Sequence, residues 1–344
     1  MFFVYAMRRV NCPTCGVKVE RVPWSSGNSP LTTAYQWFLA KWAERLAWSQ
    51  VATIFHSSWQ QVRNAVKHAV FWGVMYEDLA DVKTIGIDEI AHRKGHRYLT
   101  VVYQIDAGLK RLLWVGEHRQ AESLRRFFAT LGAEVRQGIQ FVCSDMWKPY
   151  LQVIAEQIPQ AVHVLDRFHV MAMFNRAIDQ IRADETRRLK QDGYEPLLKH
   201  SRWCLLKRRE NHTERQTVKL RELLQYNLRS VKAYLQREDF ERFWQYTSPT
   251  WAGKFLRDWC QRARRTKIEP LMKLARTLLA HEDLLLNWFR AEGQISSGSV
   301  EGLNAKAKLA FRKAYGFRDV ETAEIALYHQ LGKLPKPLFT HKYC

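Results

Sequence analysis

The order of apolar runs between residues 84 and 170 constrains the fold of this chain more than any other feature of its sequence. Three short runs with strand periodicity, "TIGID", "RYLTVVYQI" and "KRLLWVGEH", follow one another closely. A helical run ("QAESLRRFFATLG"), a strand ("IQFVCSD"), a helix ("KPYLQVIAEQI") and a strand ("AVHVLD") come next. Three meandering strands followed by strand–helix alternation predict an α/β fold with a mixed sheet.

Three of these predicted strands lead into an aspartate: Asp88 in "TIGIDEIA", Asp145 in "IQFVCSDMW" and Asp166 in "AVHVLDRFH". Alternation puts Ile85 and Ile87 on one face of the first strand and Asp88 on the other. A carboxylate at a buried strand end is costly unless something compensates its charge. Mg²⁺ is a natural compensator because it prefers oxygen ligands and leaves room for phosphate oxygens. We therefore predict that strand-end carboxylates converge on a metal site, where two ions activate an attacking oxygen and stabilise a leaving one.

A third acid, Glu301, lies in the predicted helix "SVEGLNAKAKLAFRKA". We expect Ser299 to cap this helix. An apolar stripe (Val300, Leu303, Ala307, Ala310, Ala314) would then lie beside a polar one (Glu301, Asn304, Lys308, Arg312). The carboxylate can bind a metal, and the cations can hold a nucleic-acid backbone. The alternative is an amphipathic surface helix with its acid near the positive end of the helix dipole.

The charge balance indicates a polyanionic partner. Lys and Arg number 54 against 34 acids, a formal net charge of +20. Nucleic acid is the usual partner of such a chain, and a generally basic soluble protein is the alternative. No stretch reaches the ~18 uncharged apolar residues that a membrane span needs. Apolar residues precede the first charges, the reverse of a secretory signal. We expect a cytoplasmic, nucleoid-associated protein without a membrane partner.

Residues 43–70 fit a helix-turn-helix pattern, with "HSS" as the turn. The second helix, "WQQVRNAVKHAV", is expected to bury Trp59, Val62, Ala65 and Val66. It would expose side chains suited to adenine edges and phosphates: Gln60, Gln61, Arg63, Asn64 and Lys67. The alternative is a three-helix packing module without DNA contact. A second basic run, "RRTK", supplies further candidate backbone contacts in Arg264, Arg265 and Lys267.

Cys12 and Cys15 have the C-x-x-C spacing of a zinc knuckle. Tetrahedral zinc needs four ligands, and no second pair lies nearby. The pair is therefore read either as half of a Zn²⁺ site or as a reduced, metal-free turn. The other four cysteines are scattered, so no disulfide framework is predicted.

Three long blocks carry a family resemblance: "GIDEIAHRKGHRYLTVVYQID", "CSDMWKPYLQVIAEQIPQAVHVLDRFHVM" and "SSGSVEGLNAKAKLAFRKAYGFRD". In this order they resemble the ISL3 family of bacterial insertion-sequence transposases. In that family a first aspartate precedes a basic loop, the second lies in an "SDMW.PY"-like motif with "DRFH" behind it, and the glutamate lies in a "VEG.N.K.K" helix followed by "R.AYGFR". The resemblance covers roughly residues 8–330.

The resemblance implies an RNase-H-like, retroviral-integrase-like catalytic domain with a large helical insertion. It implies a DDE transposase in which Asp88, Asp145 and Glu301 bind Mg²⁺ or Mn²⁺. The expected partners are double-stranded DNA, as terminal inverted repeats and target, and further copies of the chain assembled on that DNA. Lys308, Arg312 and Arg318 are expected to bind DNA backbone. Asp166, Arg167 and His169 match "DRFH" and are accessory candidates that position the site or the DNA, although Asp166 is equally expected as a helix cap.

The expected domains are a partial zinc-ribbon remnant and linker at 1–30, a helix-turn-helix at 31–76, a catalytic domain at 82–184 and 293–330, and a helical insertion at 185–292. Relatives carry a second cysteine pair upstream, so we expect an N-terminally truncated copy or a misassigned start. Glu89 is expected to be a supporting or surface residue. Two other functions stay open: a catalytically inactive DNA-binding relic or repressor, and a nuclease without sequence preference.

Overall fold

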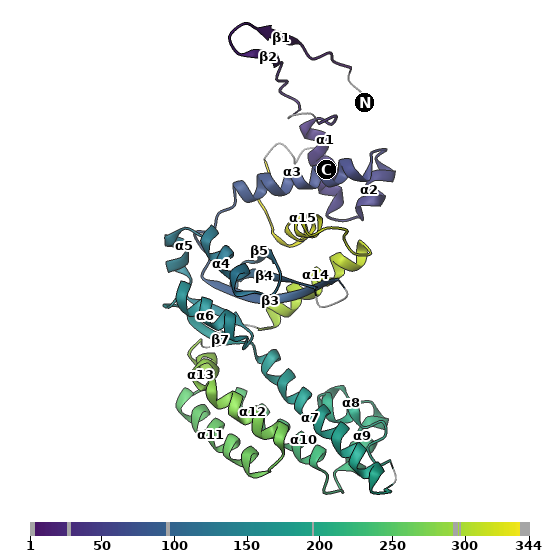
Figure 1. Cartoon of the computed structure of the whole chain (residues 1–344), viewed down its shortest axis with the longest axis vertical. Coiled ribbons are helices and arrows are strands. Elements are labelled where there is room, and N and C mark those ends of the chain that lie inside the picture. Colours follow the sequence, from purple (N-terminus) through teal and green to yellow (C-terminus); the bar gives the residue numbers. More distant parts are fainter. Residues whose placement is uncertain are drawn as a thin grey trace.

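A five-stranded mixed sheet forms the centre of the computed structural model, which describes residues 4–25, 29–93, 97–194, 196–291, 295 and 297–337. Strands β3 (Thr84–Arg93), β4 (Arg97–Ile105) and β5 (Lys110–Glu117) form an antiparallel meander. Strands β6 (Phe141–Ser144) and β7 (Val162–Leu165) continue the sheet parallel to β3, in the order β5-β4-β3-β6-β7 (Figure 1). The predicted α/β class and mixed sheet are confirmed.

Helices cover both faces of this sheet. On one face lie α4 (Ala121–Thr130), α5 (Ala133–Gly138) and α6 (Lys148–Gln157), and α4 and α6 pack their apolar side chains against Ile85 and Ile87. On the other face lie α14 (Ser297–Lys313) and α15 (Val320–Leu331), packed against Ile90, Leu99 and Tyr103. The two faces of β3 therefore alternate as its sequence predicts. The six-residue α5 buries no side chain, which explains why its sequence gives no periodic signal.

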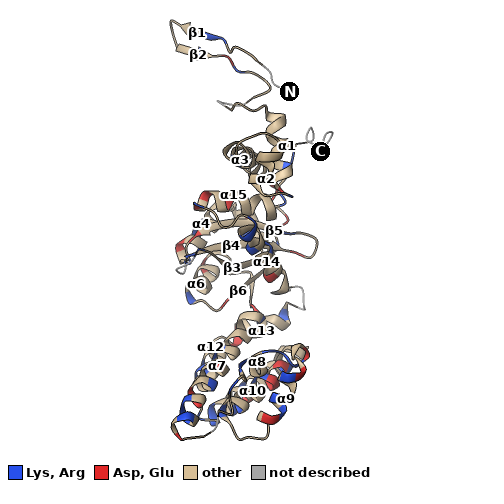
Figure 2. Cartoon of the chain, turned by 90° about the vertical axis from the view of Figure 1, so that its right-hand side faces the viewer, with Lys and Arg blue, Asp and Glu red and all other residues tan. Residues whose placement is uncertain are grey.

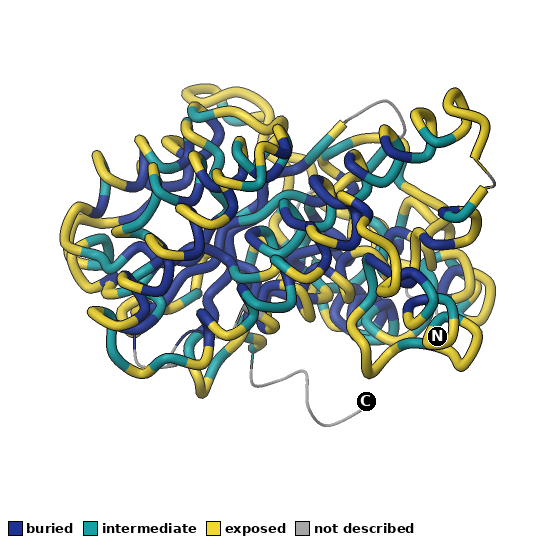
Figure 3. Tube along the Cα trace, turned by 90° about the horizontal axis from the view of Figure 1, so that it is seen from below, coloured by how far each residue is buried: buried dark blue, intermediate teal, exposed yellow. Residues whose placement is uncertain are grey.

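Residues 31–76 hold three helices, α1 (Thr33–Ala43), α2 (Trp48–Ile54) and α3 (Trp59–Met75), hereafter the three-helix unit. Ser58 caps α3, and its partner Gln61 completes a capping box. The core of the unit includes Val51, Val62 and Val66, and it is continuous with the core under α15. Figure 3, which views the molecule from below, shows buried segments toward its centre and exposed segments around its rim. The prediction that Trp59 is buried is wrong, since that side chain is 43% exposed.

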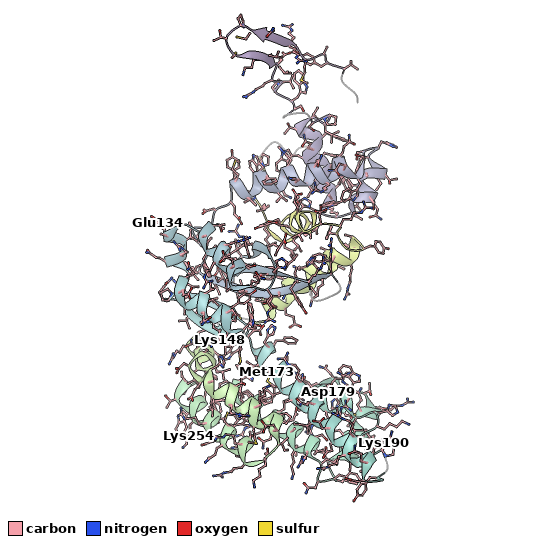
Figure 4. All side chains as sticks on the ribbon, viewed as in Figure 1. Glu134, Lys148, Met173, Asp179, Lys190 and Lys254 are labelled. Carbon is pink, nitrogen blue, oxygen red and sulfur yellow. The ribbon has the colours of Figure 1, made fainter. Side chains whose placement is uncertain are left out.

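Beyond β7 the chain forms a helical bundle at the end of the molecule opposite the three-helix unit (Figure 1). Its helices are α7 (Arg167–Gln191), α8 (Arg202–Leu206), α9 (Glu214–Leu223), α10 (Arg229–Phe240), α11 (Pro249–Arg265), α12 (Glu269–Ala280) and α13 (Glu282–Arg290), with short 3₁₀ turns at Arg209–Asn211 and Glu241–Gln245. Figure 4 shows α7 leaving the sheet near Met173 and reaching Asp179 and Lys190 in the bundle. The expected boundary at 184/185 thus falls inside one continuous helix.

The bundle has an aromatic core that also includes Leu165 of β7, and a hydrogen bond from α13 adds a second contact with that strand. Phe174, Phe240 and Trp259 pack together with ring centroids 4.6–5.3 Å apart. The side-chain amide of Asn287 on α13 donates to the carbonyl of His163 on β7 at 2.8 Å. Figure 2 shows Lys and Arg along these helices, interspersed with Asp and Glu. Within the described residues, no helix combines the length and the apolar character that crossing a bilayer would require.

A short hairpin, β1 (Arg9–Cys12) and β2 (Gly16–Val19), extends beyond the three-helix unit (Figure 1). Its side chains are almost all exposed. The C-x-x-C segment forms the turn between its strands, with Gly16 in the left-handed region at φ 74°. The five described cysteines are free thiols.

Candidate functional site

The parallel strands bring three predicted aspartates to one edge of the sheet. Gly86 pairs with Cys143, so Asp88 and Asp145, each two residues further on, lie at the same level. Ser144 pairs with Leu165, so Asp145 and Asp166 also follow directly from neighbouring positions. The predicted convergence of Asp88, Asp145 and Asp166 therefore has a structural basis in the register.

Asp88 is nearly buried, with 14% of its side chain exposed. The amide of Asn304 on α14 donates to Asp88 Oδ2 at 2.6 Å, and the hydroxyl of Tyr103 donates to Asn304 Oδ1 at 2.8 Å. The Tyr103 bond fixes which end of the Asn304 amide faces the carboxylate. Burial raises the pKa of Asp88, and the nearby His169 opposes this shift. Sequence analysis placed Asn304 on a polar stripe but did not predict its role in orienting Asp88.

Gly86 lets α14 lie close to β3. A Cβ atom on Gly86 would lie 2.5 Å from Cγ2 of Val300, so a larger residue would push the helix away. Glu301 follows Val300 and lies one helical turn before Asn304, on the exposed side. The helix that carries Glu301 therefore packs on the face of β3 that bears Asp88.

Two details of the predicted α14 are wrong. The helix begins at Ser297 rather than Val300, so Ser299 lies inside it and is buried instead of capping it. The apolar stripe is completed by Phe311, while Ala314 lies beyond the helix end and is exposed. A further helix, α15, follows α14.

Asp145 is held by Arg119, a residue that sequence analysis missed. Arg119 Nη2 lies 2.5 Å from Asp145 Oδ2, and Arg119 Nε lies 2.9 Å from Glu89 Oε1. The guanidinium carbon lies 4.8 Å from the centre of the Trp147 ring, and the Trp147 amide donates to Asp145 at 3.0 Å. Burial, reinforced by the negative charge of Asp145, raises the pKa of Glu89 to about 7 despite Arg119. No sequence motif around Arg119 predicts this role, because the contacts depend on how the loop between β5 and α4 is placed in the fold.

The "DRFH" residues divide between two tasks. Asp166 accepts from the Phe168 amide at 2.7 Å, which makes it the cap of α7, and from His169 Nδ1 at 3.0 Å. His169 Nε2 lies 3.9 Å from Asp88, and the bond to Asp166 raises the pKa of His169 to about 9. Arg167 points to the bundle instead, where it pairs with Glu241 at 2.9 Å.

Four acids and two cations therefore meet at this edge: Asp88, Glu89, Asp145 and Asp166 with Arg119 and His169. In the part of the chain that the structure describes, no three His, Cys, Asp or Glu side chains lie in position to share one metal ion. Cys12 and Cys15 are among the described residues and belong to no such group. The hydrogen bond between their side chains lowers the pKa of Cys12. Lys94–His96, in the basic loop after Asp88, lie outside the described residues.

The predicted DNA-binding face of α3 is only partly free. Arg63 pairs with Glu321 of α15 at 2.7 Å and donates to Thr322 at 2.9 Å, and only 13% of its side chain is exposed. Lys67 also pairs with Glu321. These contacts give both cations a partner within the chain, and their predicted contact with DNA stays a prediction. Gln60 and Asn64 remain exposed and bond each other at 2.9 Å, while Gln61 serves the capping box.

The other predicted DNA-binding cations are exposed. Lys308 and Arg312 lie along α14 after Glu301, and Arg318 lies in the α14–α15 loop. Arg264 and Arg265 end α11, and Lys267 follows them with φ 56°. The bundle therefore presents its cations on a different part of the molecule from the sheet edge.

Acidic side chains gathered at one edge of a mixed sheet, beside a polar helix, define the class of site that this chain carries. The family model described as a transposase of the DDE type, ISL3 group, matches residues 85–327. That match spans the sheet, the bundle and most of α15, so the chain belongs to the ISL3 family of DDE transposases.

Two curated relatives agree with the family. The chain is 33% identical over 317 residues to the transposase for insertion sequence element IS1001 of Bordetella parapertussis, covering 91% of this chain and 77% of the relative. It is 32% identical over 349 residues to the transposase for insertion sequence element IS1557 of Mycobacterium tuberculosis, covering 93% of this chain and 76% of that relative.

Proposed function

We propose that this transposase binds the terminal inverted repeats of a bacterial insertion sequence and cleaves and joins DNA through Asp88, Asp145 and Glu301. The observation that supports this most is the Asn304 bridge, because it ties the helix that carries Glu301 to Asp88. The parallel register of β3 and β6 adds Asp145 to the same edge. Both observations support a site that Asp88, Asp145 and Glu301 share.

The sheet order supports an RNase-H-like catalytic domain. Three antiparallel strands followed by two parallel ones, with helices on both faces, is the arrangement that such a domain requires. The three-helix unit supports a helix-turn-helix, in which Gln60, Gln61 and Asn64 at the start of α3 contact bases. Arg63 and Lys67 then hold α3 against α15 and fix the angle at which it meets DNA.

Mg²⁺ or Mn²⁺ is the cofactor that this donor set fits. Asp88, Asp145 and Glu301 offer only carboxylate oxygens, which hard divalent cations prefer. The acids outnumber the cations at this edge, and burial raises the pKa of Asp88 and Glu89, so a bound cation would relieve excess negative charge. Two bound ions supply activation of the attacking oxygen and stabilisation of the leaving one. To bind an ion, the Asp145 carboxylate would give up its contact with Arg119.

The chain's own residues orient the carboxylates of the site and neutralise negative charge on them and on DNA. Asn304 holds the Asp88 carboxylate in one rotamer, and His169 places a positive charge beside it. Lys308 and Arg312 hold the phosphate backbone along α14. Water first cleaves the phosphodiester at the element's end and leaves a 3′-hydroxyl. That hydroxyl then attacks a target phosphodiester in line, forms the new bond and displaces the target's own 3′-oxygen, without a covalent protein–DNA intermediate.

Transposition requires two element ends to be held together, so we propose that the active species is a dimer or larger assembly on DNA. The exposed cations of α11 and the α11–α12 turn, Arg264, Arg265 and Lys267, are placed on the bundle to bind DNA backbone outside the cleavage point. Their contribution would be independent of sequence, since phosphate contacts position the protein and carry no base information.

The test is cleavage of labelled terminal-repeat DNA by the purified chain with Mg²⁺. Asp145→Asn should lower the cleavage rate by about 100-fold or more, since a lost metal ligand costs at least as much as a lost supporting contact. DNA affinity, measured by gel shift, should be kept. The control is Asp258→Asn on the exposed surface of α11, which should cleave at the wild-type rate.

The outcomes separate the three functions. Near-normal cleavage by Asp145→Asn would contradict the triad. Repeat-specific binding by the wild-type chain without cleavage in Mg²⁺ or Mn²⁺ would identify an inactive relic or repressor. Equal cleavage of DNA lacking terminal repeats would identify a nuclease without sequence preference.

A further inference from the structure

A cleft of about 840 Å³ lies between the three-helix unit and the end of α14, away from the acidic edge. One wall comes from the α1–α2 segment and Trp59 at the start of α3. The other comes from residues 313–318 at the end of α14 and from α15. The triad described above uses none of the residues that line this cleft.

Aromatic rings form a continuous row along this cleft. The ring centroids of Trp59 and Trp48 lie 5.8 Å apart, those of Trp48 and Phe317 lie 6.2 Å apart, and those of Phe317 and Phe311 lie 5.3 Å apart. Phe311 is buried and anchors the row in the core, whereas Trp59 at the other end is exposed. Trp48 and Phe317 between them are half-buried, so the row meets solvent most openly at Trp59.

Tyr315 lines the same cleft and is held in an unfavourable backbone conformation. The Gly316 amide donates to the Phe311 carbonyl at 2.9 Å and the Tyr315 amide to the Arg312 carbonyl at 3.1 Å, a Schellman ending for α14. The left-handed residue of this motif is usually glycine, yet here it is Tyr315, with φ 52°. Its side chain is fully exposed, so packing within the described chain does not explain why a tyrosine stands there.

The charges that line the cleft favour an anion. Arg45, Lys313 and Arg318 are the cations, and Glu44 is the one acid among the lining residues that the structure describes. Glu44 already pairs with Lys336 at 2.5 Å, which leaves the cations in excess. Exposed aromatic rings among cations are the elements that bind single-stranded nucleic acid, by stacking on bases and neutralising phosphates.

The cleft also lies along the helix that leads away from the proposed active site. Lys313 comes 12 residues after Glu301, which corresponds to roughly 18 Å along α14. One strand of duplex DNA advances about 3.4 Å per nucleotide, so this length spans roughly five nucleotides. A strand cleaved at Glu301 and following Lys308 and Arg312 would reach the cleft within a few nucleotides.

We propose that this cleft binds unpaired nucleobases of DNA, which stack on Tyr315 and on the aromatic row that ends at Trp59. The position of these bases relative to the cleavage point rests on the proposed function, whereas the stacking itself does not. Base binding can therefore be measured without cleavage, in EDTA.

The experiment compares two DNAs by fluorescence anisotropy: a fully paired duplex, and the same duplex with a short single-stranded tail containing 2-aminopurine. Tyr315→Ala should weaken binding of the tailed DNA about tenfold, the effect of losing one stacking platform, and leave duplex binding within about twofold. Tyr315→Phe should bind both as the wild type does. Tyr226→Ala, which removes an exposed tyrosine of the bundle, is the matched control.

The 2-aminopurine signal gives a second, direct readout. Stacking should quench its fluorescence on the wild-type chain and on Tyr315→Phe, and quenching should be reduced on Tyr315→Ala. Unchanged affinity of Tyr315→Ala, or equal losses for tailed and paired DNA, would overturn the proposal. A loss of self-association in sedimentation instead of DNA binding would also overturn it, because the cleft would then be an interface between copies.

Discussion

The middle of α14 and its C-terminal end treat polar and aromatic side chains in opposite ways. In the middle of the helix, Asn304 is 6% exposed and bonds both Asp88 and Tyr103. Past its last residue, Tyr315 stands fully in solvent in a left-handed conformation. A site that must hold carboxylates in fixed geometry is built from saturated, buried hydrogen bonds. A site that accepts any base needs only exposed rings on a firm support.

The largest effect is expected from Asn304→Ala, which breaks the buried hydrogen bonds in the middle of α14. It leaves the Asp88 carboxylate and the Tyr103 hydroxyl without their shared partner in a nearly buried place. We expect a loss of about 2–3 kcal/mol in the free energy of unfolding and roughly 10- to 100-fold in cleavage rate. Urea unfolding and the terminal-repeat cleavage assay measure the two losses.

The control for this variant is Asn64→Ala, which removes an exposed asparagine whose only described partner is Gln60. It should cost less than about 0.5 kcal/mol. Equal stabilities of the Asn304 and Asn64 variants would mean that burial does not distinguish the middle of α14 from an ordinary helix surface.

The next largest effect is the pH dependence of stability that arises from Glu89 at the sheet edge. Burial raises the pKa of Glu89 in the folded chain to about 7, above its ordinary value of 4.5. The unfolded chain therefore releases this proton first as pH rises, and the stability that protonated Glu89 contributes is present below about pH 4.5 and lost by about pH 7. Glu89→Gln should be more stable than wild type at pH 8, by on the order of 2 kcal/mol, and equal to it at pH 4.

Thermal unfolding across this pH range, without divalent cations, measures the difference. Glu122→Gln on the exposed surface of α4 is the control and should follow the wild-type curve. If the stability of Glu89→Gln followed the same pH dependence as that of the wild type, then Arg119 would neutralise Glu89 fully. The excess negative charge at this edge would then no longer support a bound cation.

Local patterns predict the frame of the molecule well. The runs at 84–170 are strands and helices where their periodicities indicate, and the alternation around Gly86 and Asp88 is observed on the two faces of β3. Two strand-end aspartates, Asp145 and Asp166, also lie side by side as expected, because parallel register follows from strand order.

Contacts between segments far apart in the chain could not be predicted in the same way. Arg63 and Glu321 are 258 residues apart, and nothing in the α3 sequence distinguishes a cation that pairs with α15 from one that faces DNA. Arg119 reaches Asp145 and Glu89 only because its loop folds over the sheet edge. Trp59 is apolar at a position of α3 expected to be buried, yet the neighbouring cleft keeps it exposed.

The smallest expected effect separates strain from function at the exposed end of α14. Tyr315→Gly places glycine at the left-handed position of the Schellman motif, where a Cβ atom is unfavourable, and should stabilise the fold by about 0.5–1 kcal/mol. Tyr315→Ala keeps the Cβ atom, and because the lost ring is unpacked, its stability should stay near that of the wild type. Both variants should bind tailed DNA more weakly.

Urea unfolding and the tailed-DNA affinity, measured on the same preparations, place each variant on both scales. If Tyr315→Gly is more stable than the wild type but binds tailed DNA more weakly, then the tyrosine ring is retained against a conformational cost. Selection tolerates such a cost only for contact with a partner. If glycine instead lowered stability, then Tyr315 would be packed in solution, and the surroundings of Asn304 and Tyr315 would differ less than their exposures indicate.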